Sequence, residues 1–192
     1  MGKSTLGRAI ANRLGYDSLT VDDLLTAARA VTNEETHPAL HAIGRQGHLA
    51  YFTEEPKDLL VSDAQRQERA VWPMIELVIR SRVVKASPIV IDWWLLSPST
   101  VTGLEVPGVR SIWLHLEPEA LWARERRNMK WTEGSSDAEK MLENFMHRSL
   151  WRNSLVAAEA ERCDLPVLYL RGDEPAEVVT DRAIEMLALA AS

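Results

Sequence analysis

The sequence predicts an α/β protein in which helices cover both faces of a parallel sheet. Short apolar runs rich in β-branched residues, of which Ile89-Val90-Ile91 is the clearest, alternate with longer segments whose apolar residues recur at helical spacing. Such alternation is typical of a parallel sheet, because each crossover helix packs against a sheet face. The 192 residues contain no internal repeat, low-complexity tract or linker, so we expect a single domain over residues 1–192.

Spacing and capping signals define the expected elements in order. Gly15 stops the first helix, Pro118 suits the first position of its helix, and Ser62 with Gln65 forms a capping box at the start of a long helix. Pro73 predicts a kink or break in that long helix. A loop is expected over 98–107 and a polar hinge over 131–136. We expect strands over 16–21, 89–91, 109–116 and 166–170, and helices over 6–14, 24–31, 39–50, 62–83, 118–130, 138–162 and 175–190.

Composition limits the class of protein. Hydrophobic residues make up 46% of the chain and charged residues 26%, as in globular proteins. A net charge of −6 argues against general binding to nucleic acids or anionic membranes. The single cysteine, Cys163, cannot form an internal disulfide or a cysteine-based zinc site. No apolar run approaches the roughly 20 residues that cross a bilayer, and no signal peptide is evident. We therefore predict a cytoplasmic protein.

The first residues, Met1-Gly2-Lys3-Ser4-Thr5, run directly into the first expected helix. Gly-Lys-Ser-Thr at this place matches the second half of the phosphate-binding loop G-x-x-x-x-G-K-[ST]. The unpaired N–H groups and partial positive charge of a helix N-terminus favour a phosphate. Gly2 would admit the anion, Lys3 would reach the β- and γ-phosphates, and the Ser4 hydroxyl would bind Mg²⁺. An ordinary turn is the alternative, because the first half of the loop and its strand are missing.

Acidic residues follow two of the expected strands. Asp22 and Asp23 come after residues 16–21, and Asp92 comes after Ile91. Ligands of parallel sheets collect at the carboxyl ends of strands, and phosphoryl transfer needs Mg²⁺ ligands and a base for the attacking hydroxyl. We interpret Asp92 as a magnesium ligand acting with Ser4, and one of the adjacent aspartates as the base. The other would cap the following helix, and spacing alone leaves open which one does so.

Arginines are the candidate cations for the developing phosphate charge. Arg124, Arg126 and Arg127 precede the expected hinge, while Arg148 and Arg152 share one face of the next helix. Arginine suits phosphate because its planar fork donates two hydrogen bonds at once. We interpret residues 124–137 as a lid that closes over the reacting phosphates. A solvated helix surface is the alternative.

The acceptor side has the least regular pattern. His37, His41 and His48 would share a face of a helix over 38–50, but without a carboxylate partner they predict a structural role rather than a metal site. Contacts of these histidines to the acceptor, together with Arg45, are the alternative to a structural role. Trp93, with Trp94, could form a wall of its pocket. The remaining candidate substrate contacts are Asp23, Arg148 and Arg152.

This order of parts resembles the P-loop kinases of the adenylate-kinase-like group, which includes nucleotide, shikimate, gluconate and polynucleotide-kinase-type enzymes. Gly2-Lys3-Ser4-Thr5 matches the end of their phosphate loop. Leu19-Thr20-Val21-Asp22-Asp23-Leu24 is similar to the strand with a double aspartate in the polynucleotide-kinase-type members. Residues 118–127 look like their pre-lid helix, and residues 172–178 resemble their adenine-side loop.

The resemblance implies a three-layer α/β/α P-loop fold with a parallel sheet in the order 2-3-1-4-5, ATP and Mg²⁺, and transfer of the γ-phosphoryl group to a small-molecule hydroxyl. It gives Asp22 the role of base, places Arg124 on adenine and Arg127 on phosphates, and assigns Thr5, Gly172 and Pro175 to the nucleotide. Leu25 replaces an arginine that is usual in this group. Trp93-Trp94 after Asp92 differs from the glycine-containing turn of nucleotide kinases, which argues against a nucleoside monophosphate acceptor.

Strand 1 of that sheet is missing from this sequence. Its absence would leave two neighbouring strands with unpaired buried backbone groups, which is costly, so we expect the natural chain to start upstream. Two other functions stay open: a nucleotide-binding regulatory protein, and a nucleotide hydrolase that needs no acceptor. The sequence predicts neither the acceptor nor the oligomeric state.

Overall fold

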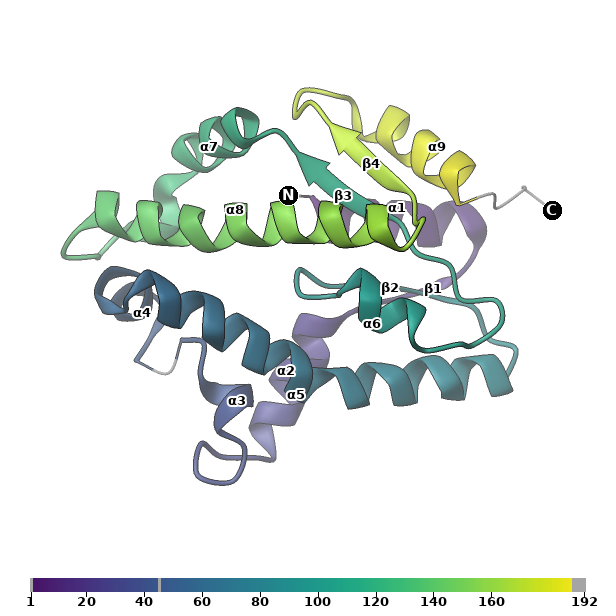
Figure 1. Ribbon diagram of the computed structural model, residues 1–192, viewed down its shortest axis with the longest axis horizontal. Coiled ribbons are helices and arrows are strands. Elements are labelled where there is room, and N and C mark those ends of the chain that lie inside the picture. Colours follow the sequence, from purple (N-terminus) through teal and green to yellow (C-terminus); the bar gives the residue numbers. More distant parts are fainter. Residues whose placement is uncertain (1, 45, 188–192) are drawn as a thin grey trace.

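The computed structural model describes residues 2–44 and 46–187, a mixed α/β chain that is mostly helical (Figure 1). Its strands are β1 (Asp17–Thr20), β2 (Ile89–Asp92), β3 (Trp113–Leu116) and β4 (Val167–Leu170). Its helices are α1 (Lys3–Leu14), α2 (Val21–Ala30), α3 (Pro38–His41), α4 (His48–Glu54), α5 (Lys57–Val84), α6 (Pro98–Thr102), α7 (Pro118–Arg127), the 3₁₀ helix η1 (Met129–Thr132), α8 (Ala138–Arg162) and α9 (Ala176–Met186).

The strands form two separate sheets of two parallel strands each. β1 pairs with β2, with Asp17 opposite Ile89, and β3 pairs with β4, with Trp113 opposite Val167. The expected α/β class is therefore observed, but the single sheet and the three-layer P-loop fold are not shown. The physical reason is that the described chain supplies no strand between β2 and β3.

Helix α1 connects the two sheets through one apolar cluster. Its Leu6 and Ile10 pack with Leu168 of β4, and the half-buried Val90 of β2 and Leu114 of β3 join them. The apolar residues whose spacing predicted this helix therefore form the face that contacts both strand pairs. Helix α9 packs on α1 and completes this cluster.

Helix α8 packs on the opposite side of β3 from α1 and also contacts α5 (Figure 1). Val156 and Ala160 of α8 pack on the buried Trp113 of β3. Asn153 of α8 lies at the edge of the same strand: the Leu116 N–H donates to its Oδ1 at 3.1 Å, and its Nδ2 donates to the Leu116 carbonyl at 2.9 Å. One buried amide thus pairs backbone groups that a neighbouring strand would otherwise pair.

Two expectations about helix starts are wrong. Helix α2 begins at Val21 with Thr20 as its N-cap, so Asp22 and Asp23 lie in the first helical turn and neither is the cap residue. Helix α5 begins at Lys57. Ser62 is therefore inside α5, where its Oγ donates to the Leu59 carbonyl at 3.1 Å instead of forming a capping box. Of the kink or break expected at Pro73, the break is absent, because α5 continues through this residue as one helix.

The continuous helix expected over residues 39–50 is also wrong. Helix α3 ends at His41 and α4 begins at His48, and Gly44 and Gly47 between them have φ values of 78° and 85°. Left-handed backbone of this kind, which glycine adopts easily, interrupts a helix. His41 and His48 therefore lie on different helices and have different partners. His41 Nε2 lies 3.0 Å from Thr32 Oγ1, and His48 Nε2 donates to the Trp131 carbonyl at 3.1 Å.

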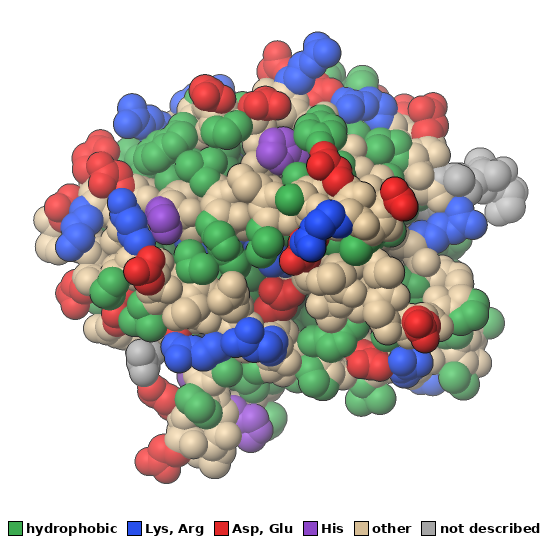
Figure 2. All heavy atoms as spheres, in the orientation of Figure 1, with side chains coloured by type: hydrophobic (Ala, Val, Ile, Leu, Met, Phe, Trp, Pro, Cys, Tyr) green, Lys and Arg blue, Asp and Glu red, His purple; other side chains and the backbone are tan. Residues whose placement is uncertain are grey.

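Other boundaries differ by smaller amounts. The strand expected over 109–116 is shortened to β3, α6 lies inside the loop expected over 98–107, and the helix expected over 118–130 divides into α7 and η1. The expected bounds of α8 are confirmed. No helix of the described residues is long and apolar enough to cross a membrane. On the face in Figure 2, basic and acidic side chains are interspersed.

Replacing Asn153 tests its role at the edge of β3. Asn153→Leu keeps the side-chain volume but leaves a buried N–H and C=O of Leu116 unpaired, so we expect a loss of about 1–3 kcal/mol in the free energy of unfolding. Urea unfolding measures it. The exposed Asn12→Leu on α1 is the matched control and should stay within about 0.5 kcal/mol of the parent. Equal stability of both variants would contradict the assignment.

Candidate functional site

The amino end of α1 meets the carboxyl end of β2. Ser4 Oγ donates a hydrogen bond to Asp92 Oδ1 at 2.6 Å. Gly7 of α1 lies against the same aspartate: a Cβ on Gly7 would be 3.4 Å from the Asp92 Cβ, at the limit of ordinary van der Waals contact. The two residues expected to bind Mg²⁺ are thus in direct contact.

The oxygen donors of this pair suit a hard cation. Among residues 2–44 and 46–187, no group of three or more His, Cys, Asp or Glu side chains could hold a metal by itself. Magnesium, however, usually takes one or two protein oxygens and completes its shell with water and substrate phosphates. Ser4 and Asp92 therefore fit a magnesium ion that arrives with a nucleotide.

Lys3, in the first turn of α1, is a poorly solvated cation. Burial lowers the pKa of Lys3, while the nearby carboxylates of Asp92 and Asp22 raise it and Arg124 lowers it. A half-buried ammonium group in this position gains stability when an anion binds, because the anion restores the lost solvation.

Asp22 is placed by its helix and by the loop after β2. It lies in the first turn of α2, and Trp93 Nε1 donates to its Oδ1 at 3.2 Å. Partial desolvation raises the pKa of Asp22, the Trp93 hydrogen bond lowers it, and Asp92 raises it. A carboxylate with a raised pKa is better suited to accept a proton. Both Asp22 and the next residue, Asp23, are exposed to solvent in part, and the raised pKa and the Trp93 hydrogen bond are those of Asp22.

A second group of expected nucleotide residues meets at the start of α1. Gly2 has left-handed backbone at φ 64°, and Arg124 Nη1 of α7 lies 4.0 Å from the place of a Cβ on it. Gly172 also has positive φ, and a Cβ there would lie 3.3 Å from the Ala120 Cβ. Gly2, Thr5, Arg124 and Gly172 all line one cavity of about 200 Å³. Pro175, the N-cap of α9, lies between two further lining residues, Glu174 and Ala176.

The other arginines of α7 are not brought to this site. Arg127 is exposed, and its Nε donates to the Ala123 carbonyl of its own helix at 3.2 Å. Arg126 lies over the Trp122 ring at 5.4 Å. In the described residues no contact joins either guanidinium to Lys3, Asp22 or Asp92, so their action on phosphates would need a movement of the 124–137 segment.

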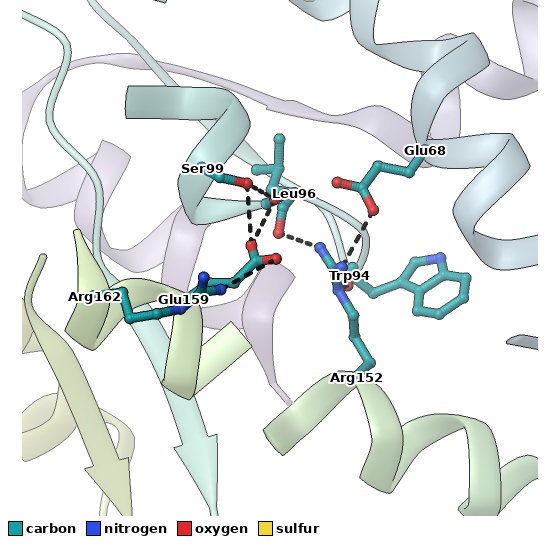
Figure 3. A network of polar contacts seen from close by, with 8 residues as sticks. Glu68, Trp94, Leu96, Ser99, Arg152, Glu159 and Arg162 are labelled. Atoms are coloured by element: carbon teal, nitrogen blue, oxygen red, sulfur yellow. Dashed lines mark hydrogen bonds and ion pairs between the residues drawn. The ribbon is translucent and has the colours of Figure 1, made fainter. Parts of the chain in front are cut away.

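Arg152 is held inside a polar network (Figure 3). Its Nη1 pairs with Glu68 Oε2 at 3.2 Å, its Nε donates to the Trp94 carbonyl at 3.2 Å, and its Nη2 donates to the Leu96 carbonyl. The Arg152 side chain is only 3% exposed. Because all three nitrogens are engaged, Arg152 fixes the loop after Asp92 to α5 and α8. Beside this network Glu159 accepts hydrogen bonds from Ser97 and Ser99 (Figure 3).

Arg148, one turn earlier on α8, is surrounded by aromatic rings. Its guanidinium lies 4.3 Å from the Trp94 ring and 4.6 Å from the Phe52 ring of α4. Burial lowers the pKa of Arg148 to about 10. Its Nε and Nη1 are buried and have no hydrogen-bond partner among the described residues. Cation–π attraction offsets part of the cost of this burial.

Only some of the predicted acceptor contacts can be located among the described residues. Trp93 is buried and touches Asp22, as described above, whereas Arg45 lies outside the described residues. Glu68 and the buried pair of Tyr51 and Asp63 were not predicted from the sequence. The Tyr51 hydroxyl donates to the Asp63 carboxylate at 3.2 Å. A carboxylate such as Asp63 on the apolar stripe of a helix was the available signal for that pair.

No protein-family model matches the sequence, and a search of the curated proteins finds no significant match.

Breaking the Arg152–Glu68 pair tests the anchoring of the loop. Arg152→Met should lower the free energy of unfolding by about 3–5 kcal/mol, because it leaves Glu68 desolvated without its cation. Arg152→Met/Glu68→Met should be more stable than the single variant in urea unfolding. Arg162→Met, at a side chain that is 71% exposed, is the control. A double variant no more stable than Arg152→Met would show that the pair does not act as a unit.

The raised pKa of Asp22 gives a stability prediction with a definite sign. At a pH between the ordinary value of 3.8 and the raised pKa, Asp22 is ionised in the unfolded chain but still protonated in the folded protein. Raising the pH through this range therefore lowers the free energy of unfolding. Asp22→Asn should therefore have a thermal midpoint at pH 7 equal to or above that of the parent, with the advantage lost in acid. Asp23→Asn is the control. A midpoint several degrees below the parent at pH 7 would refute this.

Proposed function

We propose that this protein is an ATP-dependent phosphotransferase that moves the γ-phosphoryl group to a hydroxyl of a small-molecule acceptor. The observation that supports it is the convergence of Lys3, Ser4, Asp22 and Asp92 at the amino end of α1. These four side chains come from three elements that are distant in sequence. They provide a cation, two oxygen ligands for Mg²⁺ and a candidate base, which are the parts that phosphoryl transfer requires.

In this proposal the N–H groups of the α1 amino end and the Lys3 ammonium hold the β- and γ-phosphates. Ser4 and Asp92 hold Mg²⁺, which when bound neutralises charge on the phosphate oxygens. The acceptor oxygen forms its bond to the γ-phosphorus as the bond to the bridging β–γ oxygen breaks, and ADP leaves. Asp22 accepts the proton that the acceptor hydroxyl loses.

The cavity lined by Gly2, Thr5, Arg124 and Gly172 is the proposed nucleotide side, with Arg124 against the adenine ring. The same proposal includes the arrangement of the strands and helices in a three-layer P-loop fold. The pairs β1–β2 and β3–β4 correspond to the outer pairs of a 2-3-1-4-5 sheet, and α1 with α9 and α5 with α8 correspond to its two helical layers. A nucleotide-dependent enzyme with one cysteine fits the reducing cytoplasm.

The test is ADP release from ATP over a panel of small hydroxyl compounds. We expect release to rise sharply with one compound, and to fall by about 10²–10⁴-fold in Asp22→Asn because the base is removed. Lys3→Ala should lose about 10²-fold or more. The exposed Asp58→Asn, in the first turn of α5, and the exposed Lys85→Ala are the matched controls and should retain activity.

Two results would contradict a phosphotransferase. Nucleotide binding without turnover over the whole panel would indicate a regulatory nucleotide-binding protein. ADP release that does not depend on any panel compound would indicate a hydrolase.

A further inference from the structure

Aromatic rings enclose the guanidinium of Arg148 on several sides. It lies 4.3 Å from the Trp94 ring and 4.6 Å from the Phe52 ring, and Phe145 of its own helix lies at 5.6 Å. Trp131 packs on Phe52 and Phe145 in turn. These five residues, named here the Arg148 cluster, come from α4, the loop after β2, η1 and α8. The cluster therefore joins four parts of the chain around one cation.

The Arg148 cluster holds hydrogen-bond donors without acceptors. Among the described residues, four buried side-chain nitrogen or oxygen atoms have no hydrogen-bond partner, and three of them are Arg148 Nε, Arg148 Nη1 and Trp131 Nε1. Cation–π attraction acts on the faces of a guanidinium and leaves the N–H groups at its edges unpaired. What the cluster lacks is therefore an acceptor oxygen.

The buried carboxylate of this region is already paired. Asp63 of α5 forms an ion pair with Arg66 and accepts a hydrogen bond from the Tyr51 hydroxyl at 3.2 Å. Burial lowers the pKa of Arg148, and in the described chain only Tyr51, which is not an acid at neutral pH, opposes this effect. Arg148 is thus a buried charge without a counter-ion among the described residues.

Arg152, one turn further along α8, shows how the same chain satisfies a buried guanidinium. Its counter-ion is Glu68, and two backbone carbonyls of the loop after β2 accept from its other nitrogens. A structural arginine is expected to have partners of this kind, because buried donors without acceptors are costly. Arg148 is only 7% exposed and has none in the described chain, which favours a bound ligand as the partner.

Adjacent residues connect this cation with the candidate base. Trp93 Nε1 donates to Asp22 Oδ1 at 3.2 Å, and the next residue, Trp94, lies against Arg148. The loop after β2 thus contacts the candidate base through one residue and the unpaired guanidinium through the next. A substrate that lies along this loop would meet both.

We propose that Arg148 binds an anionic group, a carboxylate or a phosphate, on the acceptor whose hydroxyl meets Asp22. The substrate class is then a small hydroxy acid or a phosphorylated alcohol, and neutral alcohols and sugars are poor acceptors. The free N–H groups of a planar guanidinium suit the oxygens of such a group, and the ion pair replaces the solvation that burial removes. The identity of the acceptor rests on the proposed function, whereas the anion site stands on the Arg148 cluster alone.

The first experiment titrates the protein with minimal anions in the absence of nucleotide and Mg²⁺. The probes are acetate, inorganic phosphate and the neutral acetamide, which has nearly the shape of acetate. The readout is the NMR signal of the Arg148 Nε–H group, identified by its loss in Arg148→Lys. Each titration is repeated in Lys3→Ala, so that phosphate bound at the amino end of α1 is not mistaken for phosphate at Arg148. We expect acetate, phosphate or both to shift the signal in a saturable manner, and acetamide to leave it unchanged.

Variants of Arg148 then measure its share of the affinity, followed by tryptophan fluorescence. Arg148→Met places an apolar side chain of similar length among the rings and should weaken anion binding by about tenfold or more. Arg148→Lys keeps the charge and should recover part of the loss. Arg162→Met, on the same helix at a side chain that is 71% exposed, is the control and should bind like the parent.

An Nε–H signal that neither anion moves, or that acetamide moves as much as acetate, would overturn the proposal. Full anion affinity in Arg148→Met would do so too. The second experiment compares ADP release from ATP with glycerate, glycerol 3-phosphate and neutral glycerol, and with larger compounds matched in the same way. Release that rises only with neutral compounds would overturn the anionic acceptor and leave a phosphotransferase intact. Anion binding at Arg148 without ADP release from any compound would refute the proposed function and leave the anion site standing.

Discussion

The hydrogen bond from Ser4 to Asp92 is the contact on which the candidate site depends. It fixes the amino end of α1 at the carboxyl end of β2, where Gly7 of α1 also packs closely against Asp92. Lys3 is thereby held near Asp22 and Asp92, and Gly2 beside Arg124. The apolar cluster of Leu6 and Ile10 packs the body of α1 on the strands, and the Ser4–Asp92 hydrogen bond adds a polar contact at its amino end.

The loop after Asp92 connects this contact to the helical side of the molecule. Trp93 reaches Asp22, Trp94 covers Arg148, and Arg152 binds the Trp94 carbonyl. This loop therefore helps to position the candidate base, Asp22, and two arginines of α8, Arg148 and Arg152. The sequence alone shows only that α8 contains several arginines. The structure shows that Arg148 and Arg152 are buried against this loop and are not surface charges.

The elements with strong local signals were predicted best. Helix α8 has the expected bounds because its apolar stripe is long, and the Ile89–Asp92 run reads as a strand from its β-branched residues. The double aspartate obscured the start of α2 at Val21, and Gly44 and Gly47 interrupt a helix that apolar spacing alone suggested. The pairing of Arg152 with Glu68, 84 residues apart, depends on a tertiary contact that no local pattern records.

The most direct measurement of the central idea is a titration of the protein with Mg²⁺ and a non-hydrolysable ATP analogue, followed by backbone amide NMR. If the amino end of α1 holds the terminal phosphates, the amide signals of Lys3, Ser4 and Thr5 should shift in a saturable manner, and the Asp92 signal should shift only when Mg²⁺ is present. Saturable binding that leaves these four amides unchanged would contradict the account.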